Sequence, residues 1–293
     1  MTSLVRKTLW GRTGVSLGVA FLILFLLNVF APIDRGSLQQ LTFSIEKGEG
    51  SREIGYNLQT QGLIRFAPFF HMYAATIGVS SRLQAGDYLL SPGMSMFNMV
   101  RKFTRGDVIQ EKLTIIEGWN IEDIENYFEK MGRLMEVSPE LEGYLFPDTY
   151  YIGKNIPNQE VIAILRANFE QKFNSDLRQE TLRQGKTIAQ IVTMASLLEK
   201  ELQTIQDKNI ASGILWKRLS IGMALQVDAE PNTYKERGLP KGPIANPGLD
   251  SLEAALYPQD SPYWYYLSTP AGTTIFSKTL EEHNIAKARY LKN

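Results

Sequence analysis

The longest apolar stretch of the chain lies near its start. Residues 13–33 carry no charged side chain, and about 20 apolar residues are enough for a helix to cross a bilayer. Three basic residues and no acidic one come before the stretch. The positive-inside rule therefore predicts a cytoplasmic tail at 1–12, a single transmembrane helix at 13–33 and an exterior remainder. A cleaved signal peptide is the alternative interpretation, but residues 28–32 make a poor cleavage site.

The residues after this stretch predict a small α+β domain at 34–108, which begins with a short linker at 34–40. Alternation, turn residues and helix caps predict, in order, a strand at 41–45, helices at 51–61 and 67–77, a strand at 86–90, and a helix at 96–103. Ser51 and Ser95 are the expected caps of the first and last helices, and Gly106 is the expected stop. The order is similar to that of a LysM-like module, with a generic α+β domain as the alternative.

The remaining residues, 109–293, have mainly helical periodicity and predict a second, larger α+β domain. Strands are expected at 111–116 and 263–268, and helices at 121–131, 158–173, 177–184, 207–220, 251–256 and 281–291. Residues 231–248 are rich in proline and glycine and predict a loop. A further helix is predicted from its cap, Thr187, with a core stripe of Ile188, Ile191, Val192, Ala195, Leu198 and Leu202.

Glu201 stands on this last helix in an apolar setting. Leu197, Leu198 and Ile205 occupy the positions four before, three before and four after it, which predicts an apolar face. A carboxyl held against apolar side chains resists ionisation and can act as an acid near neutral pH. The plainer interpretation is a partly exposed glutamate at the helix edge that either reaches water or pairs with Lys200 or Lys208. Glu199, about 200° around the helix, is expected to be solvated or salt-bridged.

Composition narrows the classes of function. The chain has no cysteine, which excludes disulfides and thiolate metal sites, and only His71 and His283, which leaves no histidine-rich metal site. No metal and no cofactor are therefore expected. Lysine plus arginine and aspartate plus glutamate are 31 each, and no basic run is interleaved with aromatics, so nucleic acid is not an expected partner.

Five motifs in order resemble the membrane-anchored endolytic murein transglycosylases, the YceG-like family. They are Glu142-Gly-Tyr-Leu-Phe-Pro-Asp148, the Glu199-Lys-Glu201 triplet, Gln226-Val-Asp228, Asn232-Thr-Tyr234 and the loop from Gly238 to Gly248. The resemblance covers nearly the whole chain. It implies that Glu201 is the catalytic acid, and it identifies 109–293 as the catalytic domain. His283, within Glu282-His283-Asn284, also matches a family position, with a helix-capping or loop-binding role as the alternative.

The resemblance implies a lyase that cuts nascent glycan strands between N-acetylmuramic acid and N-acetylglucosamine and leaves 1,6-anhydro ends. A single carboxyl suffices, because the sugar supplies its own nucleophile. The expected partners are peptidoglycan strands and the cell (inner) membrane, with peptidoglycan synthases or division proteins as further candidates. The expected substrate-binding residues are Glu142, Tyr144, Asp148, Gln226, Asp228, Asn232 and Tyr234. The aromatic segment that contains Tyr144 is expected along the glycan cleft, with a place in the core as the alternative.

Three departures from the family pattern affect the expected subsites. Leu202 follows the catalytic glutamate where many relatives have a small or hydroxyl residue, Thr274 stands where a histidine is common, and the step from Asp228 to Asn232 is short. A non-catalytic peptidoglycan-binding or cell-division scaffold is the alternative function. A pyridoxal phosphate lyase is a third hypothesis, and the predicted anchor argues against it.

Overall fold

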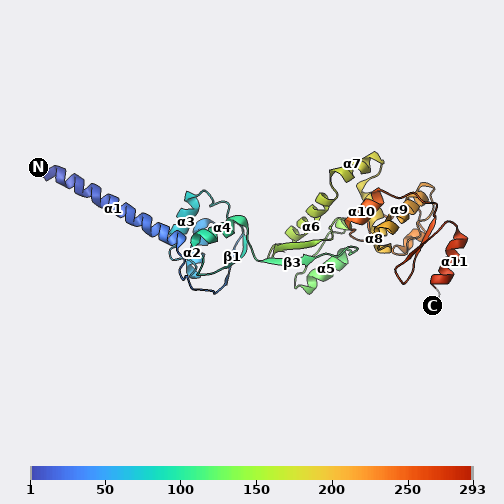
Figure 1. Cartoon of the computed structure of the whole chain (residues 1–293), viewed down its shortest axis with the longest axis horizontal. Helices are drawn as coiled ribbons and strands as arrows, with labels where there is room; N and C mark the ends of the chain where they lie inside the picture. The colour runs from blue at the N-terminus through green and yellow to red at the C-terminus, as the bar shows by residue number, and fades with distance from the viewer. Residues whose placement is uncertain (1, 292–293) are drawn as a thin grey trace. The chain divides into compact units, whose positions relative to one another are not determined.

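The computed structural model describes the backbone of residues 2–291 and the side chains of residues 15–291. The chain divides into two compact units, Met1–Lys112 with Tyr151–Ile156, and Leu113–Tyr150 with Pro157–Asn293. Helices alternate with small two-stranded sheets, so the predicted mixture of helices and small sheets is confirmed (Figure 1).

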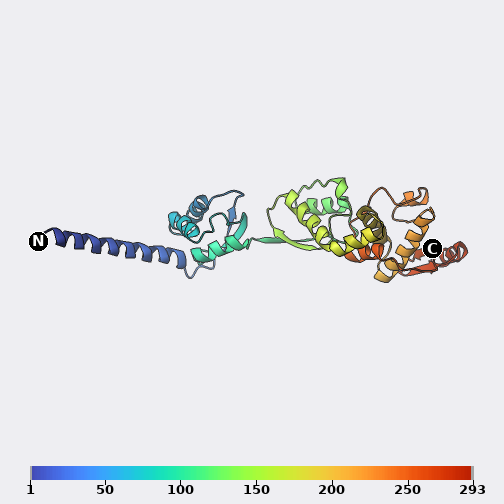
Figure 2. The same ribbon diagram turned by 90° about the horizontal axis from the view of Figure 1, so that it is seen from above.

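The first unit follows the predicted order of helices and strands. It contains α1 (Thr2–Phe30), β1 (Leu41–Ile45), α2 (Ser51–Thr60), α3 (Ala67–Thr76), β2 (Gly86–Leu90) and α4 (Met96–Arg105). The strands β1 and β2 pair antiparallel, with Phe43 opposite Tyr88, and both rings are fully buried. Figure 2 shows the segment from α2 to α4 gathered beside the C-terminal end of α1, which contacts α3 and α4.

The end of α1 is fixed by a single arginine. The helix ends at Phe30, three residues before the predicted end of the 13–33 segment. The Arg65 guanidinium then donates to the carbonyls of Ala31, Pro32 and Ile33, at 3.1, 2.6 and 3.2 Å. Within the described residues, no helix combines the length and the apolarity that a membrane crossing requires. The predicted tail 1–12 and the first two positions of the predicted span lie outside the described side chains.

Of the two helix caps predicted in this unit, Ser95 is confirmed and Ser51 is not. Ser95 caps α4 by accepting from the Asn98 N–H at 3.3 Å, and Gly106 ends the helix in the left-handed region, as predicted. Ser51 does not cap α2, and this prediction was wrong. Gly50 occupies the cap position, and the Ser51 hydroxyl instead pairs with His71 Nδ1 at 2.8 Å.

The second unit is mainly helical. It contains α5 (Ile121–Lys130), α6 (Asn158–Lys172), α7 (Ser175–Arg183), α8 (Ile188–Glu201), α9 (Ile205–Ser220), α10 (Leu249–Leu256) and α11 (Leu280–Tyr290). The strands β5 (Tyr265–Ser268) and β6 (Thr274–Ser277) form an antiparallel pair. Two further strands, β3 (Gln110–Thr114) and β4 (Thr149–Gly153), pair with each other. The sequence patterns predicted no strand at 149–153.

Helix α8 is the centre of this unit. Thr187 starts it with a reciprocal cap, in which Gln190 N–H donates to the Thr187 hydroxyl and Gln190 Oε1 accepts from Thr187 N–H. Every residue from 191 to 198 is buried, because α7, α9 and α10 all pack against the helix (Figure 1). The predicted one-sided core stripe is therefore only part of a helix that is buried all round, which explains its apolar sequence.

Candidate active site

Glu201 is the last residue of α8. Leu202 follows in extended conformation, and Thr204 caps the next helix by accepting from the Asp207 N–H at 3.1 Å. Ile205 therefore belongs to α9 and is 53% exposed. The prediction that Ile205 lies on the same apolar helix face as Glu201 was wrong, because the helix ends between the two residues. The apolar surroundings come from α8 itself, where Leu197 and Leu198 are fully buried.

The Glu201 carboxyl is partly buried and held by a backbone donor. The Ala229 N–H donates to Glu201 Oε1 at 2.7 Å. Burial raises the pKa of Glu201 above its ordinary value, and the negative charge of Asp228 raises it further, while the N–H groups of Ala229 and Asp228 oppose the shift. The last turn of a helix, whose free carbonyls carry partial negative charge, also disfavours a carboxylate. The group is thus suited to hold a proton nearer neutral pH than a surface glutamate does.

Glu201 is partly exposed at the end of α8, as the plainer interpretation predicted, but it forms no ion pair with a neighbouring lysine. Lys208 pairs with Glu199 at 3.0 Å, and the Lys200 ammonium donates to the carbonyl of Gly118 at 3.2 Å. Glu199 is not solvated either, since its side chain is only 7% exposed. The salt-bridge alternative for Glu199 is the one the structure shows. Glu201 has no ion-pair partner among the described residues.

Two cavities meet at Glu201. The first, of about 150 Å³, lies between Glu201, Arg218, Asp228, Tyr234, Tyr266 and His283. The second, of about 280 Å³, is lined by Glu201, Leu202, Gln203, Ser268 and the turn 269–272, and reaches Thr274. Two of the three departures from the family pattern, Leu202 and Thr274, thus face the second cavity. The Ser268 hydroxyl donates to the backbone carbonyl of Glu201 at 3.1 Å and fixes strand β5 to the end of α8.

Three of the predicted substrate residues line the first cavity beside Glu201. They are Gln226, Asp228 and Tyr234. The Tyr234 hydroxyl donates to Asp228 Oδ1. Burial and this bond to Asp228 raise the pKa of Tyr234 to about 12, so the phenol stays a donor. Gln226 has a φ of 54°, a left-handed conformation that side chains rarely adopt and that is found most often at functional sites.

Arg218 and Tyr266 are among the cavity residues that the sequence patterns did not identify. Arg218 is 3% exposed, and it donates to the carbonyls of Trp264 and Leu225. Tyr266 lies on β5, and its hydroxyl is buried. A signal for Arg218 was present, because it follows the buried Ala211, Ile214 and Leu215 at helical spacing. A charged residue in an apolar stripe indicates a special role.

His283, which matches a position of the family pattern, also lines the cavity. It is 8% exposed and its ring stacks on Tyr265 with the centroids 5.2 Å apart. Burial lowers the pKa of His283, and the positive charges of Lys287 and Arg218 lower it further. The imidazole is therefore neutral at neutral pH. It does not cap α11, since that cap is Thr279.

The other predicted substrate residues before α8 lie among different partners. Glu142 accepts from Ile121 N–H at 3.0 Å and from the Asn246 amide at 3.2 Å, and burial raises its pKa. Tyr144 packs against Phe169, edge to face, as part of the core. Burial acts to raise the pKa of Asp148, but the net shift is downward. Hydrogen bonds from the Asn168 amide and the Thr149 N–H, together with the positive charge of Lys172, lower the pKa. None of the three residues lines either cavity at Glu201.

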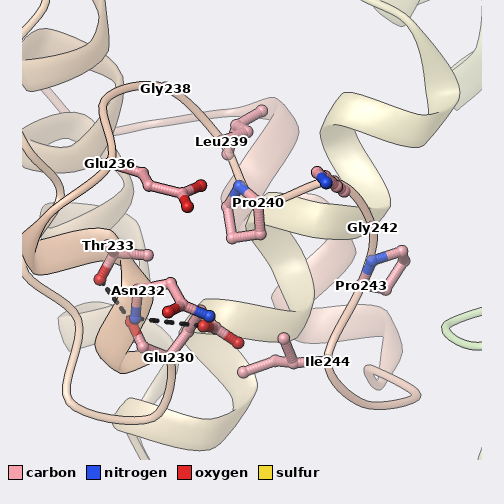
Figure 3. A pocket seen from close by; sticks show the side chains of 11 residues that line it. Glu230, Asn232, Thr233, Glu236, Gly238, Leu239, Pro240, Gly242, Pro243 and Ile244 are labelled. Carbon is pink, nitrogen blue, oxygen red and sulfur yellow. Dashed lines mark hydrogen bonds between the residues drawn. The ribbon is translucent and has the colours of Figure 1, made fainter.

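Asn232 lines a third cavity, of about 350 Å³, between the turn at Glu230 and the loop from Gly238 to Ile244. Figure 3 shows Glu230 and Asn232 on one side of this space, with Pro240 over its middle and Pro243 and Ile244 on the other side. The Asn232 N–H donates to Glu230 Oε1 at 3.2 Å. Asn232 therefore faces a different cavity from the two that Glu201 lines. The described residues contain no cluster of three His, Cys, Asp or Glu side chains that could bind a metal ion.

A partly buried carboxyl with a raised pKa thus lies where two cavities meet, one with polar and aromatic walls and one with polar and aliphatic walls. Such an arrangement is suited to proton transfer to a bound ligand. The chain belongs to the YceG-like family, whose model matches residues 43–231 and 230–289. It is 28% identical to an endolytic murein transglycosylase of Bacillus subtilis, with 91% of this chain and 89% of the relative covered.

Two further relatives agree with this assignment. An endolytic murein transglycosylase of Streptococcus pneumoniae is 26% identical over 95% of this chain, which spans 63% of that longer protein. A crystal structure of a YceG-like protein from Listeria monocytogenes superposes with a TM-score of 0.53 at 29% identity, covering 86% of this chain and all of that one.

Proposed function

We propose that this chain is an endolytic murein transglycosylase, a lyase that cleaves peptidoglycan strands between N-acetylmuramic acid and N-acetylglucosamine. The observation that carries the proposal is the Glu201 carboxyl, with its raised pKa, at the meeting point of two cavities. Because Glu201 lines both cavities, a polymer that occupies them would bring one of its bonds close to the carboxyl. The family and the names of its relatives support the same reaction.

In the proposed reaction, protonated Glu201 gives its proton to the glycosidic oxygen as the bond from that oxygen to muramoyl C1 breaks. The resulting carboxylate takes the proton of the muramoyl 6-hydroxyl, whose oxygen bonds to C1 and closes the 1,6-anhydro ring. No water is consumed and Glu201 returns to its protonated form. Because the nucleophile is already attached to the sugar, proximity replaces a second carboxylate. The Ala229 N–H holds one carboxyl oxygen in place during both transfers.

The experiment compares Glu201→Gln with the wild-type chain on uncrosslinked glycan strands, with mass spectrometry of the products. The amide can act neither as acid nor as base, so cleavage should fall at the high end of the roughly 10²–10⁴ range for a general acid or base. Glu129→Gln, an exposed residue on α5, is the matched control and should keep full activity. Glu201→Gln activity within a few-fold of wild type, in a chain that melts no lower than wild type, would refute the assignment.

The products test the reaction type independently. We expect 1,6-anhydro-muramoyl ends formed within strands and not only at their termini. Reducing ends, which borohydride would label, would mean hydrolysis with a second carboxylate. Asp228 is the residue to test in that case, because it shares the first cavity with Glu201, whereas Glu142 and Asp148 are bonded elsewhere.

We further propose that α1 anchors the protein in the cell membrane with the tail 1–12 in the cytoplasm, and that residues 34–108 form the LysM-like domain. Exposed apolar side chains along the helix support the anchor, among them Val15, Leu17, Phe21, Leu24 and Leu27, each at least half exposed. An anchor would confine the enzyme to the layer where new glycan emerges and so raise its effective concentration.

The chain without residues 1–33 should therefore keep near-normal activity on free strands but complement poorly when it is exported unanchored. Full complementation by the exported, unanchored form at native expression would exclude tethering from the mechanism. Peptidoglycan synthases and division proteins remain candidate partners at the same membrane.

A further inference from the structure

The first cavity at Glu201 contains two buried polar atoms that have no hydrogen-bond partner among the described residues. They are the Tyr266 hydroxyl and His283 Nδ1, and both residues line the cavity. Nearly all buried polar groups in folded proteins are paired, and an unpaired one costs free energy. Two such atoms around one cavity indicate that a bound ligand supplies the missing partners.

The charges around the cavity favour a neutral ligand. Its lining includes two acidic residues, Glu201 and Asp228, and two basic residues, Arg218 and Lys287. Arg218 has no carboxylate within ion-pair distance among the described residues, and backbone carbonyls accept its hydrogen bonds instead. A phosphate would meet the two carboxylates, and a cationic ligand would meet Arg218 and Lys287. A neutral polar group avoids both conflicts.

The volume of the cavity and the hydrogen-bonding groups around it further restrict which ligand it can bind. A cavity of about 150 Å³ is large enough for roughly one six-membered ring. A neutral imidazole presents one nitrogen that accepts, and a phenol presents an O–H that donates. An amide ligand needs both of these partners, a donor for its carbonyl and an acceptor for its N–H. A ligand with a single hydroxyl does not need both.

We infer that this cavity is the subsite for one N-acetylated sugar ring, whose acetamido carbonyl accepts from the Tyr266 hydroxyl and whose acetamido N–H donates to His283. The inference rests on the proposed function for the identity of the polymer. It assigns Tyr266 and His283 to substrate binding, and leaves proton transfer to Glu201.

The test measures binding of chitotetraose to the full chain carrying Glu201→Gln, which prevents turnover, with and without Tyr266→Phe. Loss of one neutral hydrogen bond should weaken binding about three- to tenfold. Cellotetraose, a neutral tetrasaccharide with the same linkage but no acetamido groups, is measured in parallel, and the ratio between the two chains is compared within each probe. We expect a ratio near one for cellotetraose, because it lacks the group that Tyr266 binds.

Tyr263→Phe is the matched control, since it removes a hydroxyl from the segment just before β5 at a residue that does not line the cavity. It should leave both affinities unchanged. Thermal melting separates binding from folding: Tyr266→Phe removes an unpaired hydroxyl, so its melting temperature should equal or exceed that of the parent. Equal chitotetraose affinity with and without Tyr266→Phe, or an equal loss on cellotetraose, would overturn the inference.

Failure of the proposed function would look different. Should the wild-type chain release no anhydro ends while Tyr266→Phe still weakens chitotetraose binding alone, the subsite stands and the reaction does not. Cleavage by the wild-type chain with an unchanged KM in Tyr266→Phe would leave the reaction intact and reject the subsite.

Discussion

The strongest stability prediction concerns the buried ion pair between Lys208 and Glu199, which stands two residues before Glu201 in the sequence. The ammonium and carboxylate are 3.0 Å apart, and the side chains are 7% and 5% exposed. Glu199 Oε2 also accepts from Gly248 N–H at 2.9 Å and from the Ser251 hydroxyl at 2.7 Å. The pair therefore joins the end of α8 to α9 and to the start of α10.

Lys208→Met removes one partner and leaves Glu199 as a buried charge without a counter-ion. Breaking a buried pair in this way costs about 3–5 kcal/mol. In a domain of about 150–250 residues, each kcal/mol lowers the melting temperature by about 2–4 °C. The expected decrease for Lys208→Met is thus roughly 6–20 °C. Adding Glu199→Leu should restore part of this loss, but not all of it, because Gly248 N–H and the Ser251 hydroxyl then lose their acceptor.

The assay is thermal denaturation of the full chain at pH 7, followed by circular dichroism. Lys172→Met is the matched control, because Lys172 and Asp148 form an ion pair in the same unit whose side chains are 38% and 41% exposed. Exposed pairs contribute at most about 1 kcal/mol. If Lys208→Met melts no lower than Lys172→Met, the pair does not hold α8 in place and the reasoning is wrong.

Two further predictions concern the pKa of Glu201. Asp228→Asn removes a negative charge that raises this pKa, so the alkaline limb of the pH profile of kcat/KM should move to lower pH; an unchanged limb, or one moved to higher pH, would contradict the assignment of the acid. Glu201→Gln should also stabilise the chain at neutral pH. Burial makes the folded state bind the proton of Glu201 more tightly than the unfolded chain does. The free energy of unfolding of the wild-type chain therefore falls as the pH rises from about 4.5 through the raised pKa. The loss is about 1.4 kcal/mol for each tenfold difference in proton affinity between the two states. Melting curves from pH 4 to 8 should show the two chains converging in acid and diverging above it, and parallel curves would exclude a buried ionisation at this position.

The sequence located the helix that carries Glu201 well and its surroundings less well. The apolar run and the Thr187 cap predicted α8, because helix periodicity and capping are local properties. Its end at Glu201 was not predicted, since the apolar Ile205 continues the spacing into what is a separate helix. The role of Glu199 was open for a related reason. Its partners Lys208, Gly248 and Ser251 lie up to 52 positions away, and periodicity carries no information about such contacts.

Some of the residues around Glu201 were identified from the sequence, and others were not. Gln226, Asp228 and Tyr234 were found by resemblance, and all three line the first cavity. Tyr266 was missed, because a tyrosine in an alternating strand is usually explained by packing. Its significance comes from a buried hydroxyl without a partner, which only the folded chain reveals.

The short step from Asp228 to Asn232 does not loosen the site, because one threonine closes the turn. Thr233 Oγ1 accepts from Val227 N–H at 2.8 Å and donates to the carbonyl of Glu230 at 2.6 Å. The Thr233 carbonyl in turn accepts from Gln226 N–H at 3.1 Å. This closed turn presents the Ala229 N–H to Glu201, so the segment that fixes the Glu201 carboxyl is held by buried hydrogen bonds and needs no longer loop for support.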